Sequence, residues 1–248
     1  MRKTIVIGIS LLFFIGIVSQ ASAKKIHCWD FIQNNECDIE EDINGDGKCN
    51  GRDCKTEEQC YAVPQTGQTG SFETGDDGDL EMGIYPPAPR FTDNLDGTIT
   101  DNLTNLMWLQ DANCIRTHYP SFDNYGTLGD GRVTWKQGLD FIAGINNGSY
   151  PDCGSNYTDW RLPNVREMLT LINYGFSVPA LSNTSGTDHW IENDPFTNVM
   201  TVLSADYWTS TTFLYLPLNA LVLVINFGTV DKVGKTGAAW VWPMRGGD

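Results

Sequence analysis

The sequence predicts an α+β fold, with a small Cys-rich module in front of a larger mixed domain. Five of the seven cysteines lie between residues 28 and 60. Two stretches of the second half repeat apolar residues at helical spacing, which predicts amphipathic helices. Residues 206–245 alternate short apolar runs with glycines, a pattern typical of β-hairpins.

Residues 1–23 have the pattern of a secretory signal peptide. Arg2 and Lys3 form a basic start, an apolar run follows, and Ala21-Ser22-Ala23 is a small-residue cleavage site. A transmembrane anchor is the alternative, but the run is short and no second hydrophobic span follows. We therefore expect a secreted, periplasmic or cell-surface protein that is not integral to a membrane once the signal is removed near Lys24.

The mature chain is strongly acidic. Without Arg2 and Lys3 it carries 14 basic and 31 acidic side chains, a net charge of −17. A surface of this charge repels nucleic acids and anionic membranes, so we expect neither as a partner. Acidic patches favour divalent cations instead.

Residues 42–53 have the ligand spacing of an EF-hand calcium loop. Gly47 occupies the sixth position, where such loops turn sharply, and Lys48 the seventh, which supplies a main-chain carbonyl. Side-chain oxygens fall at positions one, three, five, nine and twelve: Asp42, Asn44, Asp46, Asn50 and Asp53. Turns rich in Asp, Asn and Gly also occur without metal. Because calcium takes ~6–8 oxygen ligands, the spacing predicts calcium as the cofactor.

A weaker copy of this loop precedes it. Ile32 stands at its third position and Asn35 replaces the turn glycine. Oxygen-bearing side chains remain at positions one, five, nine and twelve: Asp30, Asn34, Asp38 and Glu41. We interpret this segment as a decayed or weak second site, and its calcium binding stays open.

Seven cysteines in an exported chain suggest disulfides. Cys114 and Cys153 are each other's only plausible local partners, so we predict a bond between them. The first cluster has an odd number, so one of its thiols is free or pairs between chains, and its connectivity is open: Cys28, Cys37, Cys49, Cys54 and Cys60.

Four segments follow from these patterns: the signal peptide 1–23, the Cys- and Asp-rich module 24–62, a connector 63–90 and a domain 91–248. The connector is rich in Gly, Thr and Pro, so we expect it to be extended and partly ordered.

In the domain, an Asp96-Gly97 turn predicts a hairpin over 91–101, and 104–109 continues as a strand. Thr134 is a good N-cap for a helix that ends at Asn146-Asn147-Gly148. Asn164 and Glu167 form a capping-box pattern at the start of a second helix. A long polar loop over 176–198 precedes the last predicted strands, 206–213, 220–227, 229–233 and 238–245.

Several of these segments resemble the C-terminal domain of the Legionella collagen-like adhesin, the Lcl C-terminal domain family of bacteria. The Trp160-Arg161-Leu162-Pro163 block is quite specific, and the other matches occur in family order: residues 91–102, 104–108, 207–211 and 241–247. The resemblance extends to the C-type-lectin-like group, which implies two helices beside a short, twisted antiparallel sheet with long loops on one side. The adhesin's collagen-like stalk is absent.

The resemblance implies a non-enzymatic bacterial binding or adhesion protein. In the namesake the domain is linked to sulfated polysaccharides, but only 8 Lys or Arg follow residue 90 here. A neutral glycan, or an anionic one bridged by calcium, fits this charge better, and a protein ligand or a homo-oligomer remains open.

Candidate ligand residues lie in the long loop, where an aromatic face neighbours carboxylate and amide groups: Trp190, Glu192, Asn193 and Asp194. We find no catalytic constellation, since the three histidines form no metal-binding pair and no nucleophile elbow or phosphate-binding glycine loop is present. Two alternatives remain. One is a polysaccharide-acting enzyme that uses carboxylates among Asp188, Glu192 and Asp194. The other is a calcium-stiffened structural subunit of a surface assembly.

Five tryptophans inside the family motifs are interpreted as core residues: Trp108, Trp160, Trp208, Trp240 and Trp242. Arg161 and Arg245 could bind an anion, but because each lies next to a motif tryptophan we expect them to form ion pairs that lock the fold.

Overall fold

The structure is a computed structural model that describes residues 63–154, 157–204 and 206–246. All of them fall in the second of the two units into which the chain divides, Ala62–Asp248. The signal peptide and the Cys-rich module lie outside the described residues. So do the predicted calcium ligands between Asp30 and Asp53 and the five cysteines of the first cluster.

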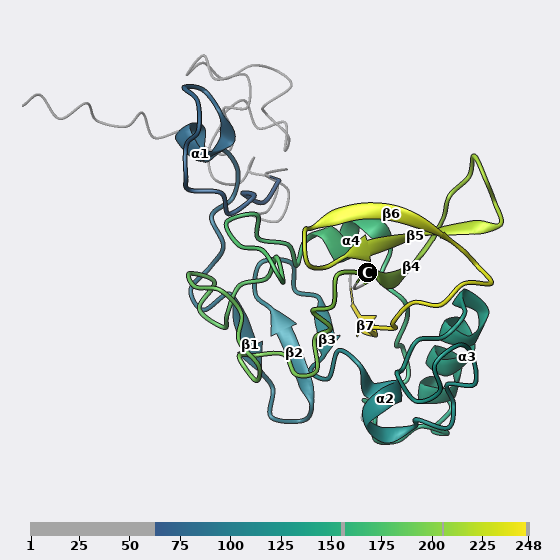
Figure 1. The fold of residues 1–248 in the computed structure, drawn as a ribbon. Coiled ribbons are helices and arrows are strands. Elements are labelled where there is room, and N and C mark those ends of the chain that lie inside the picture. Colours follow the sequence, from purple (N-terminus) through teal and green to yellow (C-terminus); the bar gives the residue numbers. More distant parts are fainter. Residues whose placement is uncertain (1–62, 155–156, 205, 247–248) are drawn as a thin grey trace, which may run out of the picture. The chain divides into compact units, whose positions relative to one another are not determined.

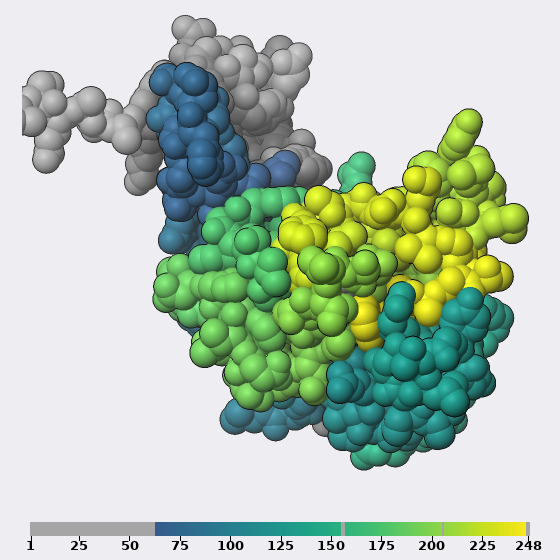
Figure 2. Space-filling view, in the orientation of Figure 1, coloured from purple at the N-terminus to yellow at the C-terminus, as the bar shows by residue number. Residues whose placement is uncertain are grey.

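The domain is built on two antiparallel sheets with short helices beside them, which agrees with the predicted α+β class (Figure 1). The first has the order β1-β2-β3-β7, with these bounds: Phe91–Asp93, Thr98–Asp101, Met107–Leu109 and Met244–Arg245. The second is the meander β4-β5-β6, with these bounds: Asp206–Thr212, Asn219–Val224 and Thr229–Gly234. The loop between β4 and β5, residues 213–218, protrudes from the surface (Figures 1 and 2).

Both predicted helices form where their caps indicate. In α3, Trp135–Asn146, the side chains of Thr134 and Gln137 bond reciprocally to each other's main chain. In α4, Val165–Leu169, Asn164 and Glu167 do the same. These reciprocal bonds satisfy main-chain N–H groups that the first turn of a helix leaves without partners. Two further short helices, α1 (Asp77–Leu80) and α2 (Cys114–His118), were not predicted.

The predicted last strand, 238–245, is mostly not a strand. Ala239 makes an isolated bridge to Val133, and Trp240 makes one to Tyr207 in the second sheet. Only Met244 and Arg245 join a ladder, opposite Trp108 and Met107 of the first sheet. The segment crosses from one sheet to the other, and a chain that changes partners cannot continue one ladder.

Aromatic side chains fill the space between the two sheets. The rings of Trp108 and Trp242 meet edge-on at 5.7 Å, and Tyr207 packs on Trp242 at 5.5 Å. Indole N–H groups in the core donate to main-chain carbonyls, from Trp242 to Leu109 at 2.8 Å and from Trp208 to Val133 at 2.7 Å. All five tryptophans predicted to be core residues are buried, which confirms that interpretation.

Arg161 and Arg245 form the ion pairs expected of them. The guanidinium of Arg161 donates to both carboxylate oxygens of Glu167, at 2.7 and 2.8 Å, and so ties the Trp-Arg-Leu-Pro block to α4. Arg245 donates to both oxygens of Asp159 at 2.7 and 2.9 Å, which anchors β7. The guanidinium of Arg245 holds the pKa of the Asp159 carboxyl below its usual value.

The predicted disulfide between Cys114 and Cys153 is present, with their Cα atoms 6.0 Å apart. It joins the start of α2 to the loop that follows α3. Both cysteines are buried, so the cross-link is part of the core.

Candidate functional site

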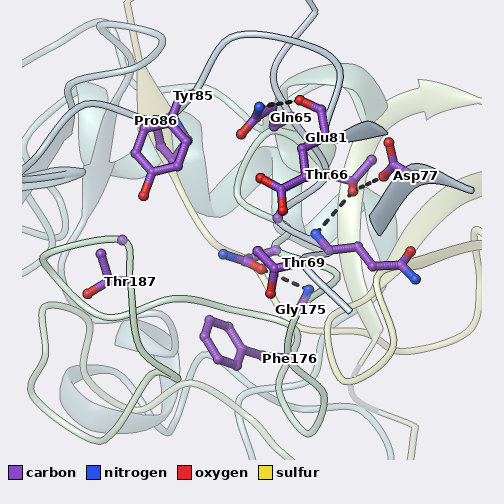
Figure 3. Close-up of a pocket in the computed structure, with 14 residues that line it drawn as sticks. Gln65, Thr66, Thr69, Asp77, Glu81, Tyr85, Pro86, Gly175, Phe176 and Thr187 are labelled. Carbon is purple, nitrogen blue, oxygen red and sulfur yellow. Dashed lines mark hydrogen bonds between the residues drawn. The ribbon is translucent and has the colours of Figure 1, made fainter. Parts of the chain in front are cut away.

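A cavity of about 210 Å³ lies where the connector folds onto the loop after α4 (Figure 3). We call it the connector cavity. The connector contributes one wall: Gln65, Thr66, Gly67, Gln68, Thr69, Asp77, Glu81, Tyr85 and Pro86. The domain contributes the other: Asn173, Gly175, Phe176, Gly186 and Thr187.

The two walls approach each other closely where glycines leave no side chain between them. A Cβ on Gly67 would lie 2.2 Å from Oδ1 of Asn173, and one on Gly175 would lie 2.5 Å from the carbonyl oxygen of Gly67. Gly67 also has φ of +84°, a conformation that side chains disfavour. Next to this contact, the N–H of Tyr174 donates to the carbonyl of Thr66 at 2.7 Å. The connector is therefore docked on the domain rather than extended throughout.

The connector wall is shaped by α1. The carboxylate of Asp76 caps this helix by accepting from the N–H of Asp79 at 2.9 Å, and it also accepts from the N–H of Phe72 at 2.7 Å. These main-chain hydrogen bonds, that of Phe72 first, lower the pKa of Asp76. The cap places Asp77 against Thr66, whose hydroxyl donates to the Asp77 carboxylate. One carboxylate is thereby fixed at the cavity wall.

Two aromatic rings border the cavity from different walls, Tyr85 from the connector and Phe176 from the domain (Figure 3). Phe176 is supported from outside the cavity, because its ring stacks on His189 at 5.3 Å. The imidazole of His189 is held in turn by the carbonyl of Pro179, 2.8 Å from Nε2. Tyr85 is 65% exposed, so much of its ring is open to a ligand.

The polar lining of the cavity consists of amides, hydroxyls and carboxylates. Gln65, Gln68 and Asn173 provide carboxamides, and Asp77 and Glu81 provide negative charge. None of the described lining residues is Lys or Arg. The side-chain amides of Gln65 and Gln68 each donate to a main-chain carbonyl, and Asn173 accepts from the N–H of Gly175. The remaining donors and acceptors of the lining suit hydroxyl groups, and it offers no cation for a sulfate, phosphate or carboxylate.

A second, more open hollow of about 580 Å³ lies at another place on the domain. Its polar lining comes from the Asp96-Gly97 turn, the end of β3, α2 and two loops: Asp96, Gln110, Asp111, His118, Asp152, Asn193 and Asn198. We call it the polar cleft. His118 Nε2 and a carboxylate oxygen of Asp111 are 4.0 Å apart, and Cys114 lies beside them. Because the sulfur of Cys114 is used in the disulfide, this group does not offer three metal ligands.

The four candidate ligand residues of the long loop lie in different local environments. Trp190 is buried, and its indole N–H donates to the carbonyl of Phe196 at 3.2 Å. The Glu192 carboxylate accepts from the N–H of Asn198 at 2.7 Å. Asp194 accepts from the N–H of Thr184 at 2.9 Å. Only Asn193 lines the polar cleft, so ligand binding by this loop stays a prediction.

Most of the domain that carries these hollows matches a family model. The model of the Lcl C-terminal domain matches residues 97–245. The chain belongs to the Lcl C-terminal domain family. Comparison with curated proteins found no significant match. Within the residues that the structure describes, no helix has the length and hydropathy needed to cross a bilayer.

The two hollows relate differently to the Lcl C-terminal domain. Nearly all of the polar cleft lies inside the matched residues, with Asp96 directly in front of them. The connector cavity takes one wall from inside the match and the other from residues 65–86, in front of it. The sequence does not predict this cavity, because the glycines and threonines of the connector have the composition of a linker. Its two walls are about 100 residues apart in sequence.

Proposed function

We propose that the protein is a secreted or cell-surface binding protein of adhesin type that recognises a neutral glycan in the connector cavity. Membership of the Lcl C-terminal domain family suggests an adhesin-like surface protein. The observation that carries the ligand class is the pairing of two aromatic rings with amides and carboxylates around one small cavity that has no Lys or Arg in its described lining.

The composition of the cavity fits a sugar ring. One face of many sugars is made of C–H groups, which pack on an aromatic ring, while the hydroxyls at its edge need fixed donors and acceptors. Tyr85 and Phe176 supply the rings, and the carboxamides and the Asp77 carboxylate supply the partners. A cavity of about 210 Å³ is below the ~300–1,000 Å³ typical of drug-sized ligands, so it suits a single sugar unit of a polymer.

The charge of the chain supports a neutral ligand over a sulfated one. The formal net charge is −15, and Asp77 and Glu81 add negative potential at the cavity itself. A sulfated polysaccharide would be repelled both at long range and at the site. Binding of a neutral glycan should therefore be insensitive to salt between about 50 and 500 mM, because no ion pair with the ligand is screened.

Calcium in the N-terminal module and a C-type-lectin-like fold for the domain are part of the same proposal. The twelve-residue spacing between Asp42 and Asp53 supports the calcium site, and the Trp-Arg-Leu-Pro block and the two capped helices support the fold. We place calcium in a structural role, because a short Cys-rich segment has little apolar core of its own.

A glycan array probed with the mature protein, with and without calcium, tests the proposal. We expect neutral glycans to bind, and the exposed-ring variant Tyr85→Ala to lose at least tenfold in affinity. Tyr125→Ala is the matched control, since Tyr125 is also exposed but lies away from the cavity. Absence of any bound glycan, or equal binding by Tyr85→Ala, would refute the assignment.

The glycans that bind on the array also distinguish an enzyme from a binding protein. A polysaccharide-acting enzyme would cleave a bound glycan, and the Glu192→Ala variant would abolish turnover while leaving the fold intact. We expect the wild type and the Glu192→Ala variant to bind the glycan without cleaving it.

A further inference from the structure

The loop between β4 and β5 is an exposed apolar projection. Its sequence is Phe213-Leu214-Tyr215-Leu216-Pro217-Leu218, and no charged residue lies between Asp206 and Asp231. Leu214 is 85% exposed, Tyr215 84% and Leu218 83%. We call residues 213–218 the finger. An apolar cluster on one exposed loop is a mark of an interaction site, whereas single exposed apolar residues are ordinary.

The finger is a preformed structure. The N–H of Leu216 donates to the carbonyl of Phe213 at 3.0 Å, and the N–H of Asn219 donates to the carbonyl of Leu216 at 2.8 Å. A third bond, from Phe213 to Asn219 at 3.0 Å, closes its base. Lys232 supports the base from β6, with its ammonium 5.7 Å from the centre of the Phe213 ring. Because the finger is already ordered, little conformational entropy is lost when it docks.

An apolar hollow of about 310 Å³ lies elsewhere on the same domain. Most of its lining is apolar and comes from the first residues of the connector and from α4 with the turn that follows it: Val63, Pro64, Leu169, Ile172 and Tyr174. Gln65, Thr66, Arg166 and Thr170 complete the lining. We call it the α4 groove. Its apolar lining and its volume suit one or two side chains of the size of leucine or tyrosine.

The finger and the α4 groove lie at opposite ends of the second sheet. The finger immediately precedes β5, whereas the groove residues Ile172 and Tyr174 contact Gly228, in the turn after β5. The Tyr174 hydroxyl donates to the carbonyl of Gly228 at 2.8 Å. Six strand residues span roughly 20 Å at about 3.3 Å each. A chain therefore cannot place its own finger in its own groove.

We propose that the finger of one molecule inserts into the α4 groove of a second copy, so that the domains associate head to tail. The contact is heterologous: each molecule offers a finger at one end of the sheet and a groove at the other, and repetition gives chains or rings. A single finger buries less than the ~1,200 Å² of a standard interface. The association is therefore weak in solution, and it becomes effective when many copies are held on one surface.

Sedimentation velocity of the mature protein, from about 5 to 500 µM, tests this contact. We expect species larger than a monomer to grow with concentration. The finger variant Leu214→Ser/Tyr215→Ser and the groove variant Val63→Asp should each remain monomeric. The control Leu95→Ser/Leu203→Ser removes equally exposed apolar side chains elsewhere and should associate like the wild type. A monomeric wild type at 500 µM overturns the proposal.

Mixing the two variants decides the geometry. The finger variant keeps its groove and the groove variant keeps its finger, so an equimolar mixture should form a 1:1 complex and nothing larger. If the groove variant alone still associates, fingers pair with fingers or with another surface, and the head-to-tail contact is wrong. The changed residues are more than three-quarters exposed. Circular dichroism and thermal melts establish that each variant is folded, and Leu218→Ser replaces any finger variant that is not.

Discussion

Arg90 holds Asp101 through two parallel hydrogen bonds, from Nε and Nη2 to the two carboxylate oxygens, each 2.8 Å long. Both side chains are buried, at 7% and 0% exposure. Nη2 also donates to the carbonyl of Thr170 at 2.8 Å, just after α4. The pair thus connects the end of the connector, the first sheet and the turn after α4 at one point.

Removing one partner of this pair should be costly. Asp101→Asn leaves the guanidinium of Arg90 buried without its counter-charge, and we expect a loss of about 3–5 kcal/mol in the free energy of unfolding. Urea denaturation followed by tryptophan fluorescence measures it. Asp140→Asn, which breaks the exposed pair with Lys136, is the control and should cost less than about 1 kcal/mol. Equal losses for the two variants would contradict the assignment of the buried pair as a structural anchor.

The disulfide should contribute comparably. Cys114 and Cys153 are 39 residues apart, and the chain-entropy relation gives about 4 kcal/mol for a loop of that length. The double variant Cys114→Ser/Cys153→Ser should therefore unfold at lower urea concentration than the wild type, with the cysteines of the N-terminal module unchanged in both. An unchanged midpoint would mean that this cross-link does not constrain the unfolded domain.

Asp206 should make stability depend on pH. Burial raises the pKa of its carboxyl; Arg132 opposes this effect, and the Asp231 carboxylate adds to it. Below the unfolded value of 3.8 both states are protonated and nothing is lost. As the pH rises, the unfolded carboxyl ionises first, so the native state loses stability relative to it. Asp206→Asn should therefore be more stable than the wild type at pH 7 and equal to it near pH 3, as thermal melts would record.

The sign of the stability change at pH 7 distinguishes a carboxyl that is destabilised by burial from one that is stabilised by an ion pair. A variant that is less stable than the wild type at pH 7 would show that ionised Asp206 is favourably paired. Asp188→Asn, at an exposed carboxyl, serves as the control and should change little at either pH.

The connector cavity should depend on one glycine. Gly67→Ala places a Cβ 2.2 Å from Oδ1 of Asn173, so the connector must move away from the domain. Gly75→Ala is the matched control, because its φ of +86° is nearly the same as the +84° of Gly67 but no atom lies within 4 Å of its Cβ. Both variants carry the same backbone strain, typically of order 1–3 kcal/mol.

Only Gly67→Ala should lose affinity for a glycan that binds the wild type, by at least tenfold, and only it should expose residues 63–85 to protease. Equal glycan binding by Gly67→Ala and Gly75→Ala would show that the cavity wall is not needed for recognition.

The predicted calcium loop has its own test. Asp46→Ala removes the carboxylate at the fifth position, so it should weaken calcium binding and lower the thermal stability of the N-terminal module while the Lcl domain melts unchanged. Isothermal titration of the mature wild type and variant measures this effect. Equal calcium binding by the two proteins would refute the loop assignment.

Local patterns predicted the parts of the fold that local interactions determine. The reciprocal caps at Thr134 with Gln137 and at Asn164 with Glu167 involve residues three apart, so a sequence motif contains the whole interaction. The Asp96-Gly97 turn and its hairpin are equally local. The pairing of Cys114 with Cys153 was predictable because the domain contains no other cysteine.

Contacts between distant residues were not predictable in this way. Arg90 and Asp101 carry no spacing that indicates a buried pair. The docking of the connector rests on Gly67 meeting Asn173 and Gly175, and glycines in a linker-like composition do not reveal that a second backbone approaches them. The segment 238–243 has the apolar and aromatic composition of a strand, because its side chains are buried in the core. Its main chain, however, passes between two sheets and makes only isolated bridges.

The hydrogen bond from the N–H of Tyr174 to the carbonyl of Thr66 affects where a truncated fragment of the protein should begin. A truncated protein that begins near residue 97, where the family match starts, would retain the second sheet and the disulfide. It would lose β1 from the first sheet, Arg90 and one wall of the connector cavity. A fragment beginning at Val63 keeps all of these. Negative results from the shorter fragment in adhesion assays would thus reflect the missing stretch rather than the biology of the full-length chain.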